Sequence, residues 1–405
     1  MINESRLVAS VVFTVLLALG CCGAVLAGTS RLPRATISPI LVRLLPGAAQ
    51  RFTVEIERHR ARPVKWLVND IAGGNTEVGK ITRDGIYKAP AQPPLPNEVH
   101  IEAIFDGAEN RCLWSTVLIG QNVPSYRLIA RWGEYGEGPC QFLEAHGIAL
   151  DADGNLLIAD TVRSRVSRFT PEGKLLGELG LGPGSAPGAF QSPPDVQAGP
   201  DGRILVLDRA NNRIQEFTRV GQVVKAWGQA GSGPGQFNRP HSIALGKGGR
   251  TYVADTDNNR IQVFDRDGKF LFAWATGAAG SDKPGTPHGV AADRNGDVFV
   301  TDFYTGCQKF TADGKLLFAF AANSERYHAL CSDRWGDVYL MARHPAFGPS
   351  IVKYNNNGAY VTRFALVRPG SAGFYPKCAV VDDKGRIYVT ESDQHNIAVD
   401  VLDPE

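Results

Sequence analysis

"HSIALGKGGRTYVADTDNNRIQVFDRDGKFLFAW", residues 241–274, consists of short apolar runs that alternate with turn residues. Short runs rich in Val, Ile, Tyr, Phe and Thr, bounded by Gly, Asn and Asp, predict β-strands rather than helices. The dipeptide Asp267-Gly268 between two such runs predicts a tight hairpin turn. The stretch therefore predicts a small antiparallel sheet of four short strands.

This four-strand pattern recurs along the chain. The units start 40 to 49 residues apart, and their first positions are His146, Pro194, His241, His288, His328 and Lys377. A period of this length predicts propeller blades or solenoid units, and four antiparallel strands per unit favour the blades of a β-propeller. Residues 125–405 are therefore expected to form six blades.

The two ends of the repeat region complement each other. The last unit stops after its third strand, at "NIAVDVLDPE", residues 396–405. The segment "YRLIARWGEYGEGPCQFLEA", residues 126–145, matches "GQVVKAWGQAGSGPGQFNRP", residues 221–240, which ends the second unit. We therefore expect the N-terminal strand of the region to complete the last blade and close the ring, which leaves no open sheet edge.

The repeated units resemble NHL repeats, a family of propeller repeats. The resemblance is clearest in "VADTDNNRIQVFDRDGKFLFAW", residues 253–274, and "GSGPGQF", residues 231–237, and it extends from Tyr126 to the C-terminus. It implies a six-bladed propeller. The second strand of most units ends in an acidic residue, and these residues are Asp160, Asp208, Asp255, Asp302 and Glu391. We interpret them as partners for buried backbone groups or for the next strand's arginine (Arg165, Arg213, Arg260).

Residues 35–121 are expected to form a separate all-β domain. "QRFTVEI", "VKWLVND" and "NEVHIEAIF" are short alternating runs bounded by Gly, Pro or Asn. The stretch "PVKWLVNDIAGGNTEVGKITRDGIYKAP", residues 63–90, resembles bacterial immunoglobulin-like domains. That resemblance implies a β-sandwich in which Trp66 fills the space between two sheets, and a role as a spacer or adhesion module.

The N-terminus predicts export. Residues 7–27 form an uncharged apolar run, and Val-Leu-Ala before Gly28 resembles a signal peptidase site, so residues 1–27 are read as a signal peptide. Residues 7–27 are also long enough for an uncleaved membrane anchor, and Cys21 lies in a sequence similar to a lipoprotein box. All three alternatives place the rest of the chain outside the cytoplasm. The net charge of +2 argues against nucleic acid as a partner.

The cysteines do not predict a metal site. After cleavage at Ala27 five would remain, an odd number that leaves at least one thiol unpaired within the chain, and none has CxxC spacing: Cys112, Cys140, Cys307, Cys331 and Cys378. Cys331 and Cys378 lie near the starts of consecutive units and are candidate neighbours, but the sequence does not decide their pairing.

Four of the eight histidines occupy the first position of a unit. In a propeller the first strand of each blade lines the central channel, so these positions ring one mouth. His146, His241 and His328 belong to blades one, three and five, about 120° apart in a sixfold ring. Three neutral imidazoles facing one axis are the ligand set of an open zinc site, with His288 as a fourth ligand or a general base. The alternative is that the imidazoles are only hydrogen-bonded at the channel mouth.

The phrases "AHGIAL", "PHSIAL" and "YHALCS" also resemble the zinc-binding phrases of peptidylglycine-amidating lyases. The resemblance implies zinc held by His146, His241 and His328, and it allows a structural calcium ion. The family's catalytic tyrosine and arginine positions hold Ala210 and Thr256 here. The nearest substitutes are Tyr304 and Arg209, which lie in other blades and become the candidate catalytic residues.

Two functions follow from these observations. The first is an exported binding or interaction module for a protein, peptide or glycan ligand, with the N-terminal sandwich as a spacer. The second is a zinc-dependent lyase or hydrolase that works at the histidine mouth of the channel. Fold alone does not choose between them, because propellers carry many unrelated functions.

Overall fold

The computed structural model describes residues 35–56, 59–61, 65–104, 112–120, 124–277, 285–302, 306–321, 326–344, 348–366, 375–392 and 397–404. The predicted signal peptide or anchor and Tyr304 lie outside these ranges. Within them there is no α-helix, and hence no helix able to cross a membrane. The helical turns are the 3-10 helices η1 (Arg209–Asn211), η2 (Lys247–Gly249) and η3 (Thr256–Asn258). The predicted all-β class is confirmed.

The N-terminal region contains three sheets, whose strand orders are β1-β4-β5, β3-β10-β9-β8 and β2-β12-β11-β6-β7. Their strands are β1 (Ala35–Ser38), β2 (Leu41–Leu44), β3 (Ala49–Arg51), β4 (Thr53–Ile56), β5 (His59–Ala61), β6 (Lys65–Val68), β7 (Ile71–Ala72), β8 (Gly74–Asn75), β9 (Gly79–Ile81), β10 (Ile86–Lys88), β11 (Glu98–Ile104) and β12 (Cys112–Ile119). All three sheets contribute to one apolar core, which includes Ile37, Tyr87 and Val99. Trp66 belongs to this core and is 6% exposed, as its sequence context predicts.

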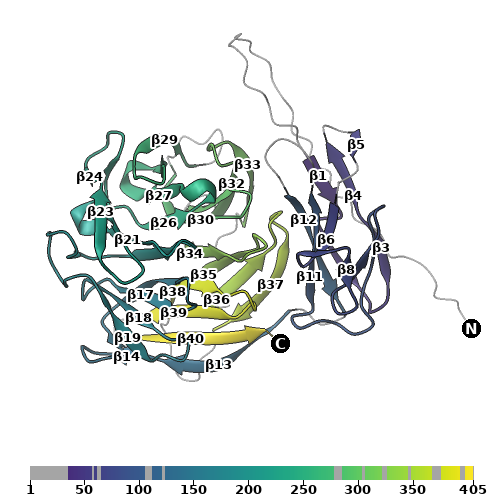
Figure 1. Ribbon diagram of the computed structural model, residues 1–405, viewed down its shortest axis with the longest axis horizontal. Coiled ribbons are helices and arrows are strands. Elements are labelled where there is room, and N and C mark those ends of the chain that lie inside the picture. Colours follow the sequence, from purple (N-terminus) through teal and green to yellow (C-terminus); the bar gives the residue numbers. More distant parts are fainter. Residues whose placement is uncertain are drawn as a thin grey trace, which may run out of the picture. The chain divides into compact units, whose positions relative to one another are not determined.

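Six four-stranded antiparallel sheets follow along the chain (Figure 1). In order they are the first sheet β16 (Ala145–Leu150), β17 (Leu156–Asp160), β18 (Arg165–Phe169), β19 (Leu175–Leu179); the second β20 (Asp195–Ala198), β21 (Ile204–Asp208), β22 (Arg213–Phe217), β23 (Val223–Trp227); the third β26 (Ser242–Leu245), β27 (Thr251–Asp255), β28 (Arg260–Phe264), β29 (Phe270–Ala275); the fourth β30 (Pro287–Ala292), β31 (Val298–Asp302), β32 (Gly306–Phe310), β33 (Leu316–Phe320); the fifth β34 (Arg326–Ser332), β35 (Val338–His344), β36 (Gly348–Tyr354), β37 (Tyr360–Ala365); and the sixth β38 (Tyr375–Val381), β39 (Ile387–Ser392), β40 (Ile397–Pro404), β13 (Tyr126–Trp132).

Two small parallel pairs lie in the glycine-rich connections between these sheets. They are β14 (Glu134–Tyr135) with β15 (Gln141–Phe142), and β24 (Gln229–Ala230) with β25 (Gln236–Phe237). Phe142 and Phe237 are fully buried in these pairs, so the repeated Gln-Phe dipeptide anchors each connection to the apolar core.

The sheets follow one another through their first strands. β16 contacts β20, β20 contacts β26, and the contacts continue through β30, β34 and β38 to β16 again. The sixth sheet combines strands from both ends of the region, because β13 pairs antiparallel with β40. These pairings are consistent with a propeller.

In four of the six sheets an aspartate side chain stabilises the hairpin between the first and second strands. In the first sheet Asp151 Oδ1 accepts hydrogen bonds from the backbone N–H of Asp153, at 2.8 Å, and of Asn155, at 2.9 Å. Gly154 lies between them with φ of 77°, a conformation that glycine adopts without strain. Asp293, Asp333 and Asp382 make the same pair of bonds in later sheets. The local sequence therefore specifies these four turns.

The strand-ending acids satisfy buried polar groups, as predicted. Asp208 Oδ1 accepts the backbone N–H of Gln191 at 2.6 Å, and its Oδ2 accepts Arg213 Nε at 2.8 Å. Asp255 makes equivalent bonds to the backbone N–H of Asn238 and to Arg260 Nε, both at 2.8 Å. These carboxylates tie each sheet to the connection before it.

A buried charged cluster joins β11 to the fifth sheet, within the compact unit formed by Ala35–Glu405. Lys353 Nζ lies 2.6 Å from Glu98 Oε2 and 3.2 Å from Asp337 Oδ2. His100 Nε2 lies 3.1 Å from Asp337 Oδ2, and the His100 ring stacks on Trp335 with ring centroids 4.7 Å apart. All four titratable side chains are buried, so the charge on each is stable only because its partners in the cluster compensate it.

The histidine of this cluster predicts how stability varies with pH. Burial alone would lower the pKa of His100, but the charges of Asp337 and Glu98 outweigh it and raise that pKa to about 9. The folded state therefore holds the proton more tightly than the unfolded chain, whose histidine pKa is 6.5. The resulting stabilisation, about 3 kcal/mol, is complete below the unfolded pKa and is lost as pH rises through the folded one.

Urea unfolding of the wild type and of His100→Gln tests this dependence. At about pH 6 the wild type should be the more stable protein, and at about pH 9.5 most of that advantage should be gone. A difference between the two proteins that stays constant with pH would contradict the raised pKa of His100.

Candidate metal centre

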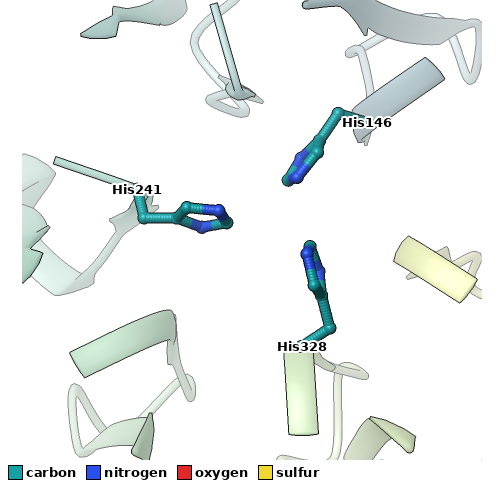
Figure 2. A group of neighbouring side chains, drawn as sticks. All are labelled: His146, His241 and His328. Carbon is teal, nitrogen blue, oxygen red and sulfur yellow. The ribbon is translucent and has the colours of Figure 1, made fainter. Parts of the chain in front are cut away.

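Three imidazoles converge at the starts of the first, third and fifth sheets (Figure 2). His146 lies at the start of β16, His241 directly precedes β26, and His328 lies near the start of β34. One ring nitrogen from each lies within 4.8 Å of the other two. The ring centroids are 5.0 to 5.5 Å apart. The structure therefore brings together the histidines of the first, third and fifth units.

Backbone carbonyls orient two of these rings. His146 Nδ1 donates to the carbonyl oxygen of Pro194 at 2.8 Å, and His328 Nδ1 donates to that of Lys377 at 3.1 Å. A carbonyl oxygen only accepts, so Nδ1 must carry the proton and a neutral ring keeps its lone pair on Nε2. Each acceptor occupies the first position of the next unit along the chain. Such bonds hold metal-ligating histidines in one tautomer and orientation.

His288 occupies the same repeat position and makes the same kind of bond as His146 and His328. Its Nδ1 donates to the carbonyl oxygen of His328 at 2.5 Å, and its ring centroid lies 3.5 Å from that of His241. It is not part of the group of three converging nitrogens. Its predicted role as fourth ligand or general base stays a prediction.

Burial keeps all four imidazoles neutral. It lowers the pKa of His146 and of His241 well below the ordinary value. It also lowers the pKa of His288 to about 4 and that of His328 to about 3, with neighbouring positive charges adding to the effect. Neutral imidazole is the form that binds a transition metal, so the cluster needs no deprotonation at neutral pH.

Positive side chains lie beside the histidines. The charges of Arg209 and Lys377 both contribute to lowering the pKa of His146. Lys377 Nζ lies 3.4 Å from Glu144 Oε1, and Arg209 Nη2 donates to Ser192 Oγ at 3.4 Å. The charge of the candidate Arg209 thus acts on the cluster, whereas Tyr304 lies outside the described residues.

Ala210 and Thr256 occupy the positions at which the resemblance to the lyases would place a catalytic tyrosine and arginine. Ala210 donates its backbone N–H to the carbonyl oxygen of Gln191, and the buried Thr256 donates its hydroxyl to the carbonyl oxygen of Pro287 at 2.8 Å. Ala210 thus contacts the connection before the second sheet, and Thr256 contacts the first strand of the fourth sheet.

A cavity of about 660 Å³ is lined largely by residues of the six first strands. Its polar lining includes Asp195 and Ser242, which follow Pro194 and His241 in sequence. Sequence reasoning did not select Asp195, because the residue after the first position differs in chemistry from unit to unit. The only signal was a carboxylate at an otherwise small or apolar position.

The five cysteines of the described residues are free thiols. Cys331 and Cys378 line the cavity and are close enough for one to affect the pKa of the other, which confirms that they are neighbours. Burial raises the pKa of both thiols, so neither is a ready thiolate.

Glu98, His100 and Asp337 form a second group with metal-ligand chemistry. There the Lys353 ammonium lies against both carboxylates and already supplies a positive charge. The histidine group contains no such internal cation, which makes it the stronger candidate for a metal ion.

Comparisons with known proteins support the repeat assignment. Residues 142–169, 237–264 and 285–307 match the NHL repeat. No curated protein matches the chain. Solved structures that resemble it include a protein of unknown function from Bacteroides thetaiotaomicron, with 15% identity, a TM-score of 0.52, and coverage of 93% of this chain and 98% of that one.

Two further structures are similar at lower scores. Virginiamycin B lyase from Staphylococcus aureus is 14% identical over 84% of this chain and 99% of its own, with a TM-score of 0.48. A gluconolactonase from Xanthomonas campestris is 13% identical over 65% of this chain and 88% of its own, also at 0.48. The NHL matches and the cyclic contacts of the first strands show that the chain carries NHL repeats in a propeller-like fold, and its function has to be argued from its own residues.

Proposed function

We propose that residues 126–404 form a six-bladed NHL-repeat propeller, closed by β13, that binds zinc through His146, His241 and His328 and acts as a zinc-dependent lyase or hydrolase. The cyclic contacts of the first strands and the β13–β40 pairing support the closed ring. The convergence of three neutral imidazoles, two of them held by backbone carbonyls, carries the metal assignment.

The residues of the site fit zinc. Zinc is commonly held by three protein ligands in catalytic sites, where a fourth position stays open, and neutral imidazole is a preferred ligand. The nitrogens are already near one another, and burial favours the uncharged ligand form. When bound, zinc supplies Lewis acidity toward an oxygen atom.

The protein's own side chains favour an anionic ligand group. Arg209 offers a planar guanidinium with one long hydrogen bond within the described residues, so most of its donors are available. Lys377 adds a second positive charge on the other side of His146, since the second and sixth sheets both contact the first through their first strands. We assign Arg209 the task of binding and orienting such a group.

The remaining parts of the proposal concern location and domain type. We propose that residues 1–27 direct export and that the N-terminal sheets form an immunoglobulin-like sandwich. The sequence pattern around Trp66 and the core shared by the three sheets support the second point.

Elemental analysis of the mature protein, purified without chelators or a histidine tag, tests the function. We expect about one zinc ion per chain in the wild type and none in His241→Ala. Absence of metal from the wild type, including after dialysis against zinc, would overturn the enzyme proposal. The chain would then be a binding module that uses its cavity and channel mouth for an extracytoplasmic protein, peptide or glycan ligand.

A further inference from the structure

A buried carboxylate lies directly beside the strands that carry two of the three histidines. Asp195 begins β20 and follows Pro194, whose carbonyl oxygen accepts the Nδ1–H of His146. The Asp195 side chain lines the central cavity, although the residue is only 5% exposed. Neither the histidine pattern nor the repeat pattern accounts for an acid at this position.

Asp195 is bonded to the strand of His241. Its Oδ2 accepts the hydroxyl of Ser242 and the backbone N–H of Ile243, both at 2.9 Å. Its Oδ1 accepts the backbone N–H of Val196 at 2.9 Å. Ser242 and Ile243 directly follow His241, so movement of this carboxylate would be transmitted to that ligand.

On its other side Asp195 packs against the residue after His146. A Cβ atom added to Gly147 would lie 2.6 Å from Asp195 Cα and 2.9 Å from its Oδ1, which is too close for any side chain. Gly147 is therefore required for the approach of Asp195. The carboxylate thus lies between the strands of His146 and His241.

Asp195 also differs from the other acids near the site in its charge environment. Glu144 is paired with Lys377, whereas no lysine or arginine within the described ranges pairs with Asp195. Burial raises the pKa of Asp195 to about 6 even though hydrogen bonding to four groups favours its ionised form, those of Ser242, Ile243, Val196 and Gln197. Such an uncompensated buried carboxylate is costly unless a positive charge binds near it.

The metal centre lacks a negative charge of its own. Its three ligands are neutral, and the cations Arg209 and Lys377 lie beside them. We infer that Asp195 is a positioning residue of this centre, whose carboxylate supplies the missing negative charge and ties the His241 strand to the His146 strand. This inference rests on the proposed zinc site.

Asp195→Asn tests the inference, because it keeps the shape and one oxygen acceptor but removes the charge. Zinc affinity, measured by competition with a chromophoric chelator at about pH 7.5, should fall about 10- to 100-fold, as is typical when an outer partner of a metal ligand is removed. The visible absorption spectrum of the cobalt-substituted protein should shift as well, since the ligand geometry changes. A purely structural role would lower stability without altering that spectrum.

Two further variants complete the experiment. Ser242→Ala removes the hydrogen bond from the Ser242 hydroxyl to Asp195 but keeps the Asp195 carboxylate. It should therefore weaken zinc binding less than Asp195→Asn does. Asp151→Asn is the matched control: this buried acid lines the same cavity, lies just beyond the far end of β16, and pairs with Arg168 at 3.1 Å. It should leave zinc affinity and the cobalt spectrum unchanged.

The outcomes separate the two proposals. If the wild type binds no zinc, the proposed function fails and Asp195 loses its role with it. If the wild type binds zinc and Asp195→Asn binds it equally well with the same cobalt spectrum, only the inference about Asp195 is overturned. Circular dichroism shows whether Asp195→Asn folds. If it does not fold, Ser242→Ala decides: unchanged zinc affinity and an unchanged cobalt spectrum in that variant would overturn the proposed role of the Asp195–Ser242 hydrogen bond.

Discussion

Replacing His146 with alanine is expected to weaken zinc binding by more than about 100-fold, a larger loss than removal of an outer partner typically causes. The imidazole of His146 is one of the three converging rings, and its Nδ1 is already committed to the carbonyl oxygen of Pro194. Among the described residues, no further ligand atom belongs to this converging group. The same change at His288 is expected to leave zinc affinity nearly unchanged, because that ring lies outside the converging group.

The pair of variants is informative because the two histidines share one repeat position. Chelator competition gives the affinities, and thermal unfolding with added zinc gives an independent reading, since a ligand that binds only the folded state raises its stability. Zinc should stabilise the wild type and His288→Ala but not His146→Ala. Equal losses in both variants would show that His288 is a ligand, which is the role the repeat pattern allows.

Replacing Lys353 with methionine is expected to lower the free energy of unfolding by about 3–5 kcal/mol, the usual cost of breaking a buried ion pair. The ammonium lies 2.6 Å from Glu98 and 3.2 Å from Asp337, and methionine fills similar space without the charge. Burial alone would lower the pKa of Lys353, but Glu98 and its other acidic neighbours raise it well above its usual value. The lysine is therefore charged, and its removal leaves two buried carboxylates sharing His100.

Urea unfolding with matched controls measures this effect. Lys315→Met changes an exposed lysine and should stay within about 0.5 kcal/mol of the wild type. The double variant Glu98→Gln/Lys353→Met also removes one of the two buried carboxylates that Lys353→Met leaves without their lysine. It should therefore recover part of the stability that Lys353→Met loses. A loss below about 1 kcal/mol in Lys353→Met would mean that the cluster contributes little.

The strands and turns were predictable because their signals are local. The aspartates that cap the first hairpins of four sheets, and the bond from a strand-ending acid to the arginine of the next strand, act over about five residues or fewer, so the chain near them specifies the outcome. The repeat register also placed His146, His241 and His328 at equivalent positions, since equal spacing along the chain becomes equal placement in the fold.

The sequence by itself thus determined an all-β chain of repeated four-strand sheets and a set of histidines that share one register. Only the tertiary structure decided which of these rings converge, because His288 has the same register and the same kind of backbone bond as His146 and His328, and yet its nitrogens lie outside the converging group. It also brought Asp195 between the strands of His146 and His241, and Glu98 against Lys353, and in both cases the neighbours are distant along the chain. Such burial depends on how separate sheets pack, and no local pattern of residues records it.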